Sequence, residues 1–184
     1  EIDRENKIIT DLLALVKMEK GATGLNIEAC DINAMMELII KRLGPIARKN
    51  EVDLIFESHR SVMAEIDEVK LTLALSNLIE NGIKYNVSGG KLTVNLLRQD
   101  DNAILQVSDT GMGIPEDALN HIFERFYRVD KARSRATGGS GLGLAIVRAI
   151  VQRNRGEITV DTELGKGTVF TVTFPVFETE VDAQ

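Results

Sequence analysis

The sequence has one cysteine, two histidines and no long apolar run. A single cysteine, Cys30, excludes a disulfide framework, and we interpret it as a small buried apolar residue. So few histidine and cysteine side chains also leave little from which to build a zinc site. No apolar stretch approaches the length that spans a bilayer, and no signal peptide is visible. The chain begins at Glu1 inside a helical pattern, so we interpret it as a piece of a longer protein.

The 184 residues carry a formal net charge of −6, and 43% of them are hydrophobic. An acidic chain of this kind lacks the basic surface that binds nucleic acid. Its apolar content is enough for a packed core, and its length suits one domain with a short additional segment. We expect a first helix within 1–22, a main domain over 25–176 and a flexible tail over 177–184.

Three segments have apolar residues at helical spacing, over 1–20, over 31–49 and from 67 to about 85. The first has one apolar face, which typically packs on another helix. Asp31 is a plausible cap for the second, and Pro45 is expected to kink or interrupt it.

Alternating apolar residues predict short strands later in the chain, near 52–56, 61–66, 92–96, 103–108, 157–161 and 168–174. Pro115 is expected to open a short helix toward Phe126, and another helix follows Gly143. Strands that come in hairpins argue against a doubly wound parallel sheet. We therefore expect an α+β fold, a two-layer α/β sandwich whose mixed, mostly antiparallel sheet is covered by helices on one face.

A polar face is predicted on the third helix. Asn77, Asn81, Lys84 and Tyr85 share one helical face beside an apolar stripe. An Asn carbonyl oxygen suits Mg²⁺, and Lys84 is well placed for a phosphate. From this segment alone, an ordinary solvated helix face is an equally good interpretation. Gly82 costs about 1 kcal/mol relative to Ala in a helix, which indicates close packing there.

A glycine-rich turn from Asp109 to Gly113 follows a predicted strand. Its glycines permit backbone angles that hold Asp109 at the floor of a pocket. A carboxylate there accepts a hydrogen bond from the exocyclic amine of adenine, whereas guanine offers a carbonyl. The alternative is a plain tight turn with a solvated Asp.

A second glycine-rich run, from Gly138 to Leu144, opens a helix and could bind an anion through its backbone N–H groups. It is neither a dinucleotide-binding fingerprint nor a Walker A loop. Between the two runs, Arg125 and Arg128 begin a basic stretch that continues to 137. This stretch is either an exposed loop or a mobile lid over phosphates, in which Arg128 would stabilise the transferring phosphoryl group.

Together these elements resemble the catalytic ATP-binding domain of sensor histidine kinases, in the superfamily shared by gyrase, Hsp90 and MutL. The resemblance covers about residues 25–176 and rests on an N box, a first glycine box, an F box, a second glycine box and a last glycine turn, at 77–85, 109–113, 123–126, 139–143 and 165–168. It implies the Bergerat-type ATP-binding fold, with ATP and Mg²⁺ as cofactors.

The resemblance also implies roles for particular residues. Asn81, with Asn77, would hold Mg²⁺, Lys84 would contact phosphate, and Asp109 would bind the adenine amine. The catalytic residues would be Asn77, Lys84 and Arg128. Nucleotide contacts would come from Asn81, Tyr85, Asp109, Gly111, Gly113, Ile114, Phe123, Arg125, Tyr127, Gly139, Ser140, Gly141, Leu142, Gly143, Leu144 and Thr168.

Residues 1–20 resemble the second helix of a dimerisation and phosphoacceptor hairpin. His59 and His121 both lack the acidic residue and proline that follow an acceptor histidine. The resemblance thus implies phosphoryl transfer to a histidine outside this chain, a homodimeric parent, and a response regulator receiver domain as partner. The chain would be the cytoplasmic part of a membrane-anchored protein and would itself touch neither membrane nor nucleic acid.

One position separates kinases from ATPases. The ATPases of the superfamily resemble one another in having a glutamate, the general base for water, one turn before the magnesium-binding Asn. Asn77 occupies that position here and cannot take a proton, and Glu80 is expected to point elsewhere. We therefore expect a kinase. The alternatives are a degenerate nucleotide-gated binding module, an ATPase, and an anti-sigma Ser/Thr kinase, which fits poorly with the helix over 1–20.

Overall fold

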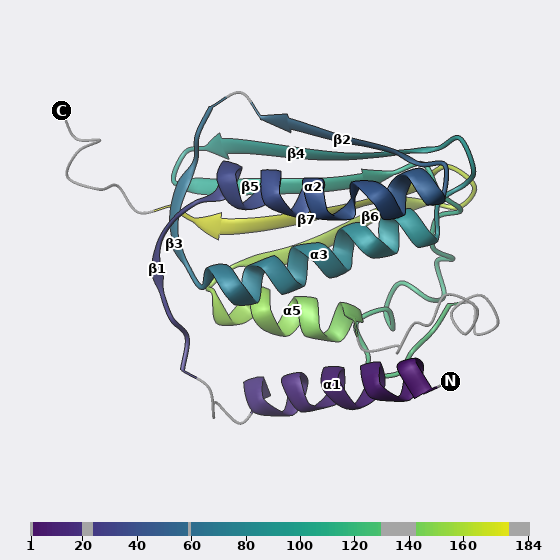
Figure 1. The fold of residues 1–184 in the computed structure, drawn as a ribbon, viewed down its shortest axis with the longest axis horizontal. Helices are drawn as coiled ribbons and strands as arrows, with labels where there is room; N and C mark the ends of the chain where they lie inside the picture. The colour runs from purple at the N-terminus through teal and green to yellow at the C-terminus, as the bar shows by residue number, and fades with distance from the viewer. Residues whose placement is uncertain (1, 20–23, 59, 130–142, 177–184) are drawn as a thin grey trace.

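The computed structural model describes residues 2–19, 24–58, 60–129 and 143–176 (Figure 1). Its elements follow one another as α1 (Ile2–Glu19), β1 (Glu28–Asp31), α2 (Ile32–Lys49), β2 (Asp53–Ser58), β3 (Met63–Ile66), α3 (Glu68–Lys84), β4 (Lys91–Gln99), β5 (Asn102–Asp109), α5 (Gly143–Arg153), β6 (Glu157–Glu163) and β7 (Gly167–Pro175).

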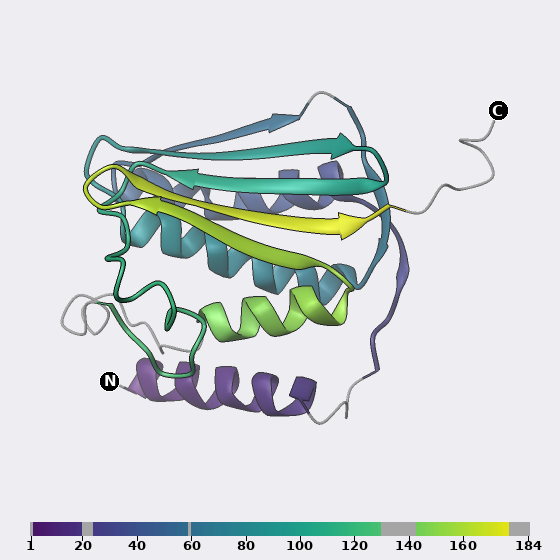
Figure 2. The same ribbon diagram turned by 180° about the vertical axis from the view of Figure 1, so that it is seen from behind.

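The architecture is a two-layer sandwich. Five strands form one sheet in the order β2-β4-β5-β7-β6, in which only the β2–β4 pair is parallel. Helices α2, α3 and α5 cover one face of this sheet (Figures 1 and 2). The predicted mixed, mostly antiparallel sheet with helices on one face is therefore confirmed. The opposite face of the sheet carries no helix of the described chain.

Helix α3 forms because its capping residue and the spacing of its apolar residues both favour a helix. The side chain of Asp67 caps the first turn by accepting the N–H of Lys70 at 3.1 Å. Leu71, Leu75 and Leu78 follow at helical spacing and are at most 1% exposed, so one face of the helix lies in the core. This burial fixes the rotation of α3 and turns its other face toward the end of β5.

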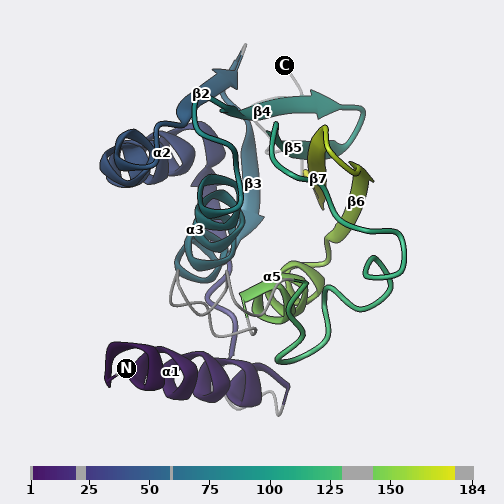
Figure 3. The same ribbon diagram turned by 90° about the vertical axis from the view of Figure 1, so that its right-hand side faces the viewer.

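Helix α1 lies outside the sandwich and packs against α5 (Figure 3). Leu15 joins the core with 2% of its surface exposed, whereas Ile9 and Leu13 remain 57% and 54% exposed. The helix therefore has one apolar side that is covered and a second that is open. None of the helices in the described part of the chain combines the length and apolar character needed to cross a bilayer.

Strand β1 has no counterpart in the sequence-based expectation. It pairs antiparallel with β3 in a separate two-stranded sheet, with Cys30 opposite Ala64. Cys30 is buried, as predicted, and this burial, assisted by nearby carboxylates, raises the pKa of its thiol to about 11. The four residues of β1 are too few to show an alternating pattern, so only the pairing with β3 identifies them as a strand.

Two sequence-based expectations are wrong, an interruption of the second helix at Pro45 and a short helix after Pro115. Helix α2 continues through Pro45 without interruption. Pro45 is exposed, so water can satisfy the carbonyl that loses its helical partner. The segment from Pro115 to Phe126 is a series of turns and no helix. Its bonds close over three residues, as from the N–H of Ala118 to the Pro115 carbonyl at 2.9 Å. Phe126 has a φ of 63°, which a continuing helix excludes.

Candidate nucleotide-binding site

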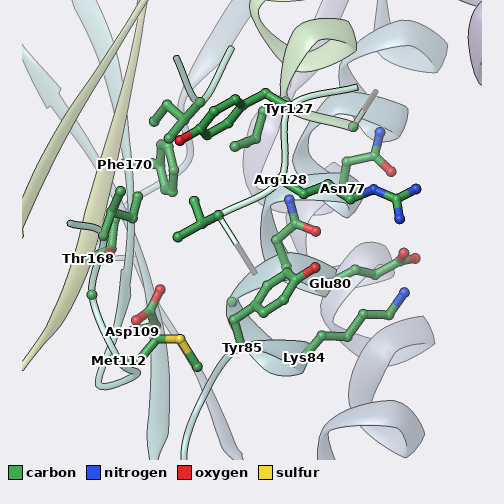
Figure 4. Close-up of a pocket in the computed structure, with 18 of the residues that line it drawn as sticks. Asn77, Glu80, Lys84, Tyr85, Asp109, Met112, Tyr127, Arg128, Thr168 and Phe170 are labelled. Atoms are coloured by element: carbon green, nitrogen blue, oxygen red, sulfur yellow. The ribbon is translucent and has the colours of Figure 1, made fainter. Parts of the chain in front are cut away.

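A pocket opens between α3 and the ends of β5 and β7 (Figure 4). Asp109 and Thr168 lie on its sheet side, and Glu80, Lys84 and Tyr85 lie on its helix side. Its lining includes most of the residues that the sequence predicted, namely Asn77, Asn81, Lys84, Tyr85, Asp109, Gly113, Ile114, Tyr127, Arg128, Gly143, Leu144 and Thr168.

Three predicted site residues do not line the pocket. Gly111 packs against the backbone of Tyr85 and Asn86, Arg125 is exposed, and Phe123 packs against the hydrophobic core. The ring of Phe123 meets Phe170 edge-on at a centroid distance of 6.5 Å, and Arg148 lies 5.3 Å above the same ring. Phe123 therefore positions Phe170, which does line the pocket. The predicted contacts at Gly139, Ser140, Gly141 and Leu142 lie outside the described residues.

Asp109 is held at the floor of the pocket by backbone groups. Its Oδ1 accepts the N–H of Gly111 at 2.9 Å. Burial raises the pKa of this carboxyl above its ordinary value, while hydrogen bonds from the backbone of Gly111 and Thr168 lower it. Burial is the larger effect, so the ionised carboxylate lacks some of the stabilisation that water would give it. A ligand that donates a hydrogen bond to this carboxylate would restore part of it.

The glycines around Asp109 let three stretches of backbone meet. A Cβ on Gly111 would lie 2.6 Å from the carbonyl oxygen of Tyr85, at the end of α3. A Cβ on Gly113 would collide with Glu163, and one on Gly167 with the carbonyl of Asp109. Gly113 and Gly167 also have φ angles of 73° and 140°, which other residues rarely adopt. Gly111, Gly113 and Gly167 thus mark points where backbone segments pack closely.

The two ends of the pocket differ in chemistry. Apolar side chains in the lining are those of Met112, Ile114, Leu144 and Phe170, and Met112 lies beside Asp109 in Figure 4. The other end is formed by the amides and the ammonium group of α3. Asn77 is only 9% exposed there, and its Nδ2 has no hydrogen-bond partner among the described residues. A buried amide donor without a partner is uncommon, and it fits a ligand that supplies an acceptor oxygen.

A magnesium ion with phosphates would fit the donors at this end. Mg²⁺ prefers oxygen ligands and is usually held by one or two protein groups together with substrate phosphates. Asn77 and Asn81 each have an amide oxygen, and Lys84 adds a positive charge for phosphate. Among the side chains that the structure describes, no group of three or more His, Cys, Asp or Glu is placed to hold a metal.

Glu80 corrects the sequence-based expectation, because it lines the pocket instead of pointing elsewhere. The reason is helical spacing. Glu80 lies three residues after Asn77 and four before Lys84, and residues three or four apart share a face of a helix. The same spacing could have placed Glu80 in the site from the sequence.

Other lining residues were missed for different reasons. Lys7 reaches the pocket from α1, where its Nζ lies 3.5 Å from Oδ2 of Asp11. No sequence pattern links such distant segments. Met112 and Gly82 lie inside predicted motifs and could have been included. The remaining lining residues that the sequence analysis did not name are Ile122, Val129 and Phe170.

A half-buried carboxylate in a partly apolar cleft, facing amides and cations on a helix, is typical of a nucleotide-binding domain. Residues 66–178 match the family described as histidine kinase-, DNA gyrase B- and HSP90-like ATPase. The chain belongs to this family, and the resemblance seen in its motifs is confirmed.

Two similar proteins are sensor histidine kinases. The chain is 40% identical to RppB of Synechocystis sp., in a match that covers 97% of this chain and 39% of RppB. It is 39% identical to WalK of Bacillus subtilis, in a match that covers 99% of this chain and 30% of WalK. The full-length structure of ShkA in complex with AMPPNP superposes with a TM-score of 0.82 at 26% identity, over 96% of this chain and 37% of that chain. The chain thus spans less than half the length of these proteins.

Proposed function

We propose that this chain is the ATP-binding catalytic domain of a sensor histidine kinase. In this proposal, ATP binds with Mg²⁺, and its γ-phosphoryl group passes to a histidine on a helical hairpin. Residues 25–176 would form the catalytic domain, and residues 1–22 would contribute the second helix of the hairpin. The observation that carries the proposal is the pairing of Asp109 at one end of the pocket with the amides of α3 at the other.

Asp109 would select adenine. An ionised carboxylate can only accept hydrogen bonds, and the exocyclic amine of adenine donates one. Guanine has a carbonyl oxygen at the corresponding position, so it would bring two acceptors together and leave both without a donor. Tyr85, Ile114, Tyr127 and Leu144 would border the base and sugar.

The phosphates would lie against α3. Asn81 and Asn77 would hold Mg²⁺, which neutralises phosphate charge when bound. Lys84 would contact a phosphate, and Arg128, which extends toward the α3 side of the pocket in Figure 4, would stabilise the transferring group. Gly143 begins α5, and its neighbours from Gly139 to Leu142 would add backbone N–H groups.

A groove between α2 and α3 supports transfer to a separate helix. It shares Lys7, Asn77 and Glu80 with the pocket, so the two are continuous. Val69 and Leu73 on its rim are 80% and 41% exposed, although both are apolar. An amphipathic helix carrying the acceptor histidine could cover these side chains and bring its imidazole to the phosphate end.

The proposed parent protein is a membrane-anchored homodimer with this part in the cytoplasm. The exposed Ile9 and Leu13 of α1 lie one helical turn apart, as residues of a helix–helix interface do. We propose the receiver domain of a response regulator as the partner that takes the phosphoryl group onward. A net charge of −6 argues against nucleic acid as a partner.

ATP hydrolysis is a second candidate because Glu80 lines the pocket. Asn77 cannot act as a general base, but a carboxylate on the next turn could activate water. A third possibility is a nucleotide-gated binding module that holds ATP without chemistry. All three functions share the same ATP pocket, so only the fate of the γ-phosphoryl group separates them.

The test follows γ-labelled ATP in the presence of Mg²⁺ and a hairpin with the acceptor histidine, taken from a relative such as WalK. The proposal predicts ATP binding, label on the hairpin and little free phosphate. Glu80→Gln should leave ATP binding intact, and Glu57→Gln, at an exposed position of β2, is its matched control. Rapid phosphate release that Glu80→Gln abolishes would establish the ATPase instead. ATP binding without label or phosphate would leave only the binding module.

A further inference from the structure

The chain reverses direction between the end of α3 and the start of β4 around the side chain of Asn86. This side chain is 7% exposed. Its Nδ2 donates to the carbonyl of Lys91 at 2.9 Å, and its Oδ1 accepts the N–H of Val87 at 2.8 Å. Asn86 therefore ties the C-terminal end of α3 to the first residue of β4.

Thr110 closes the same network from the other side. Its hydroxyl donates to Oδ1 of Asn86 at 3.1 Å and accepts the N–H of Lys91 at 2.9 Å. Its own N–H donates to the Lys91 carbonyl at 3.1 Å. Asn86, Lys91 and Thr110 thus form a closed ring of hydrogen bonds. None of the three lines the pocket.

The ring joins the turn that carries Asp109 to the C-terminal end of α3, the helix that carries Asn81 and Lys84. Thr110 follows Asp109 directly, and Asn86 follows Tyr85 directly, so each of these two ring members is one residue from the pocket. The backbone next to the ring has no spare room, because a Cβ on Gly111 would lie 2.6 Å from the Tyr85 carbonyl oxygen. A Cβ on Gly90 would collide with the Asn86 side chain itself. A change in the ring would therefore move the turn relative to α3.

We propose that Asn86 is a positioning residue, acting with Thr110, that fixes the adenine-binding carboxylate of Asp109 at one set distance from the phosphate-binding face of α3. The inference rests on the proposed binding of ATP. A ligand that spans both ends gains affinity from this fixed distance, because the second contact then needs no rearrangement of the site. A ligand that meets only one end gains nothing from it.

The experiment measures the affinities of ATP with Mg²⁺, adenosine and tripolyphosphate for the wild-type chain, Asn86→Ala and Thr110→Val. Both variants should bind ATP about tenfold more weakly, as expected for a lost hydrogen-bond network, yet bind adenosine and tripolyphosphate as the wild type does. The double variant should lose no more than either single one, because the ring is broken once. Thr110→Ser keeps the hydroxyl and should keep wild-type affinity.

Asn50→Ala is the matched control. Asn50 also follows a helix and donates from Nδ2 to a backbone carbonyl at 2.8 Å, but it lies outside the pocket lining. Wild-type ATP affinity in Asn86→Ala or Thr110→Val would overturn the inference. So would an equal loss for adenosine and ATP, which would reduce the ring to local support for Asp109. If the wild type itself binds no ATP, the proposed function fails first, and the inference fails with it.

Discussion

Replacing Asp109 with Asn should weaken ATP binding while leaving the ligand-free fold at least as stable. Asn has nearly the shape of Asp but replaces one acceptor oxygen with an NH₂ donor. Its remaining oxygen can accept the N–H of Gly111, now at 2.9 Å from Asp109 Oδ1, or face the adenine amine, but not both equally well. The loss of a charge-assisted hydrogen bond costs about 1.5–3 kcal/mol, which is about a 10- to 150-fold loss of affinity.

The stability effect has the opposite sign. Burial raises the pKa of Asp109 above the ordinary value of 3.8, so the folded chain holds this proton more tightly than the unfolded chain does. The stabilising contribution of Asp109 is therefore complete below pH 3.8 and is lost as the pH rises through the folded-state pKa. At pH 7 the ionised carboxylate opposes folding, and the uncharged Asn removes that cost.

Calorimetric titration with ATP and urea unfolding without ligand would measure both effects. Asp109→Asn should unfold at an equal or higher urea concentration than the wild type at pH 7, and this advantage should shrink near pH 4. Asp161→Asn, at an exposed position of β6, is the matched control and should change neither ATP affinity nor the urea concentration of unfolding. A variant that binds ATP like the wild type, or that unfolds more easily at pH 7, would refute the reasoning.

Three further substitutions test how the site and helix α3 are supported. Gly167→Ala should weaken ATP binding at least tenfold and destabilise the fold by about 1–3 kcal/mol, since its Cβ would collide with the Asp109 carbonyl at a φ of 140°. Gly165→Ala also has a positive φ but open space around it, so calorimetry should find ATP affinity unchanged. Asp67→Ala removes the cap that accepts the Lys70 N–H, and urea unfolding should show a loss of about 1–2 kcal/mol.

The sequence predicts the parts of the fold in which local preference and tertiary packing agree. Helix α3 is the clearest case, because Asp67 caps it and its apolar residues repeat at helical spacing. Gly82 shows what a single residue in the sequence can and cannot predict. The predicted close packing is present, since a Cβ there would lie 2.7 Å from Cδ1 of Leu92 on β4. The sequence indicates that something packs there but does not identify the neighbour.

The site is predictable where one motif supplies its residues and not where separate segments meet. Asn77, Asn81 and Lys84 come from one helix, so helical spacing alone places them on a common face. Lys7 and Phe170 reach the same pocket from α1 and β7. Their placement depends on how α1 packs against α5 and on the order of strands in the sheet, which short patterns do not encode.

Two polar groups of the pocket could each form a hydrogen bond with a nucleotide. Asp109 is a partly desolvated carboxylate that can accept a further hydrogen bond beside those from the backbone of Gly111 and Thr168, and Nδ2 of Asn77 is a buried donor that needs an acceptor. Desolvating the carboxylate and burying the amide donor without a partner both cost folding free energy, so core packing alone would favour apolar residues at both positions. A ligand that satisfies both must have a donor at its apolar end and an anionic acceptor at the other. Adenine and the phosphates of ATP meet these requirements in that order, which supports the proposed ligand independently of the family match.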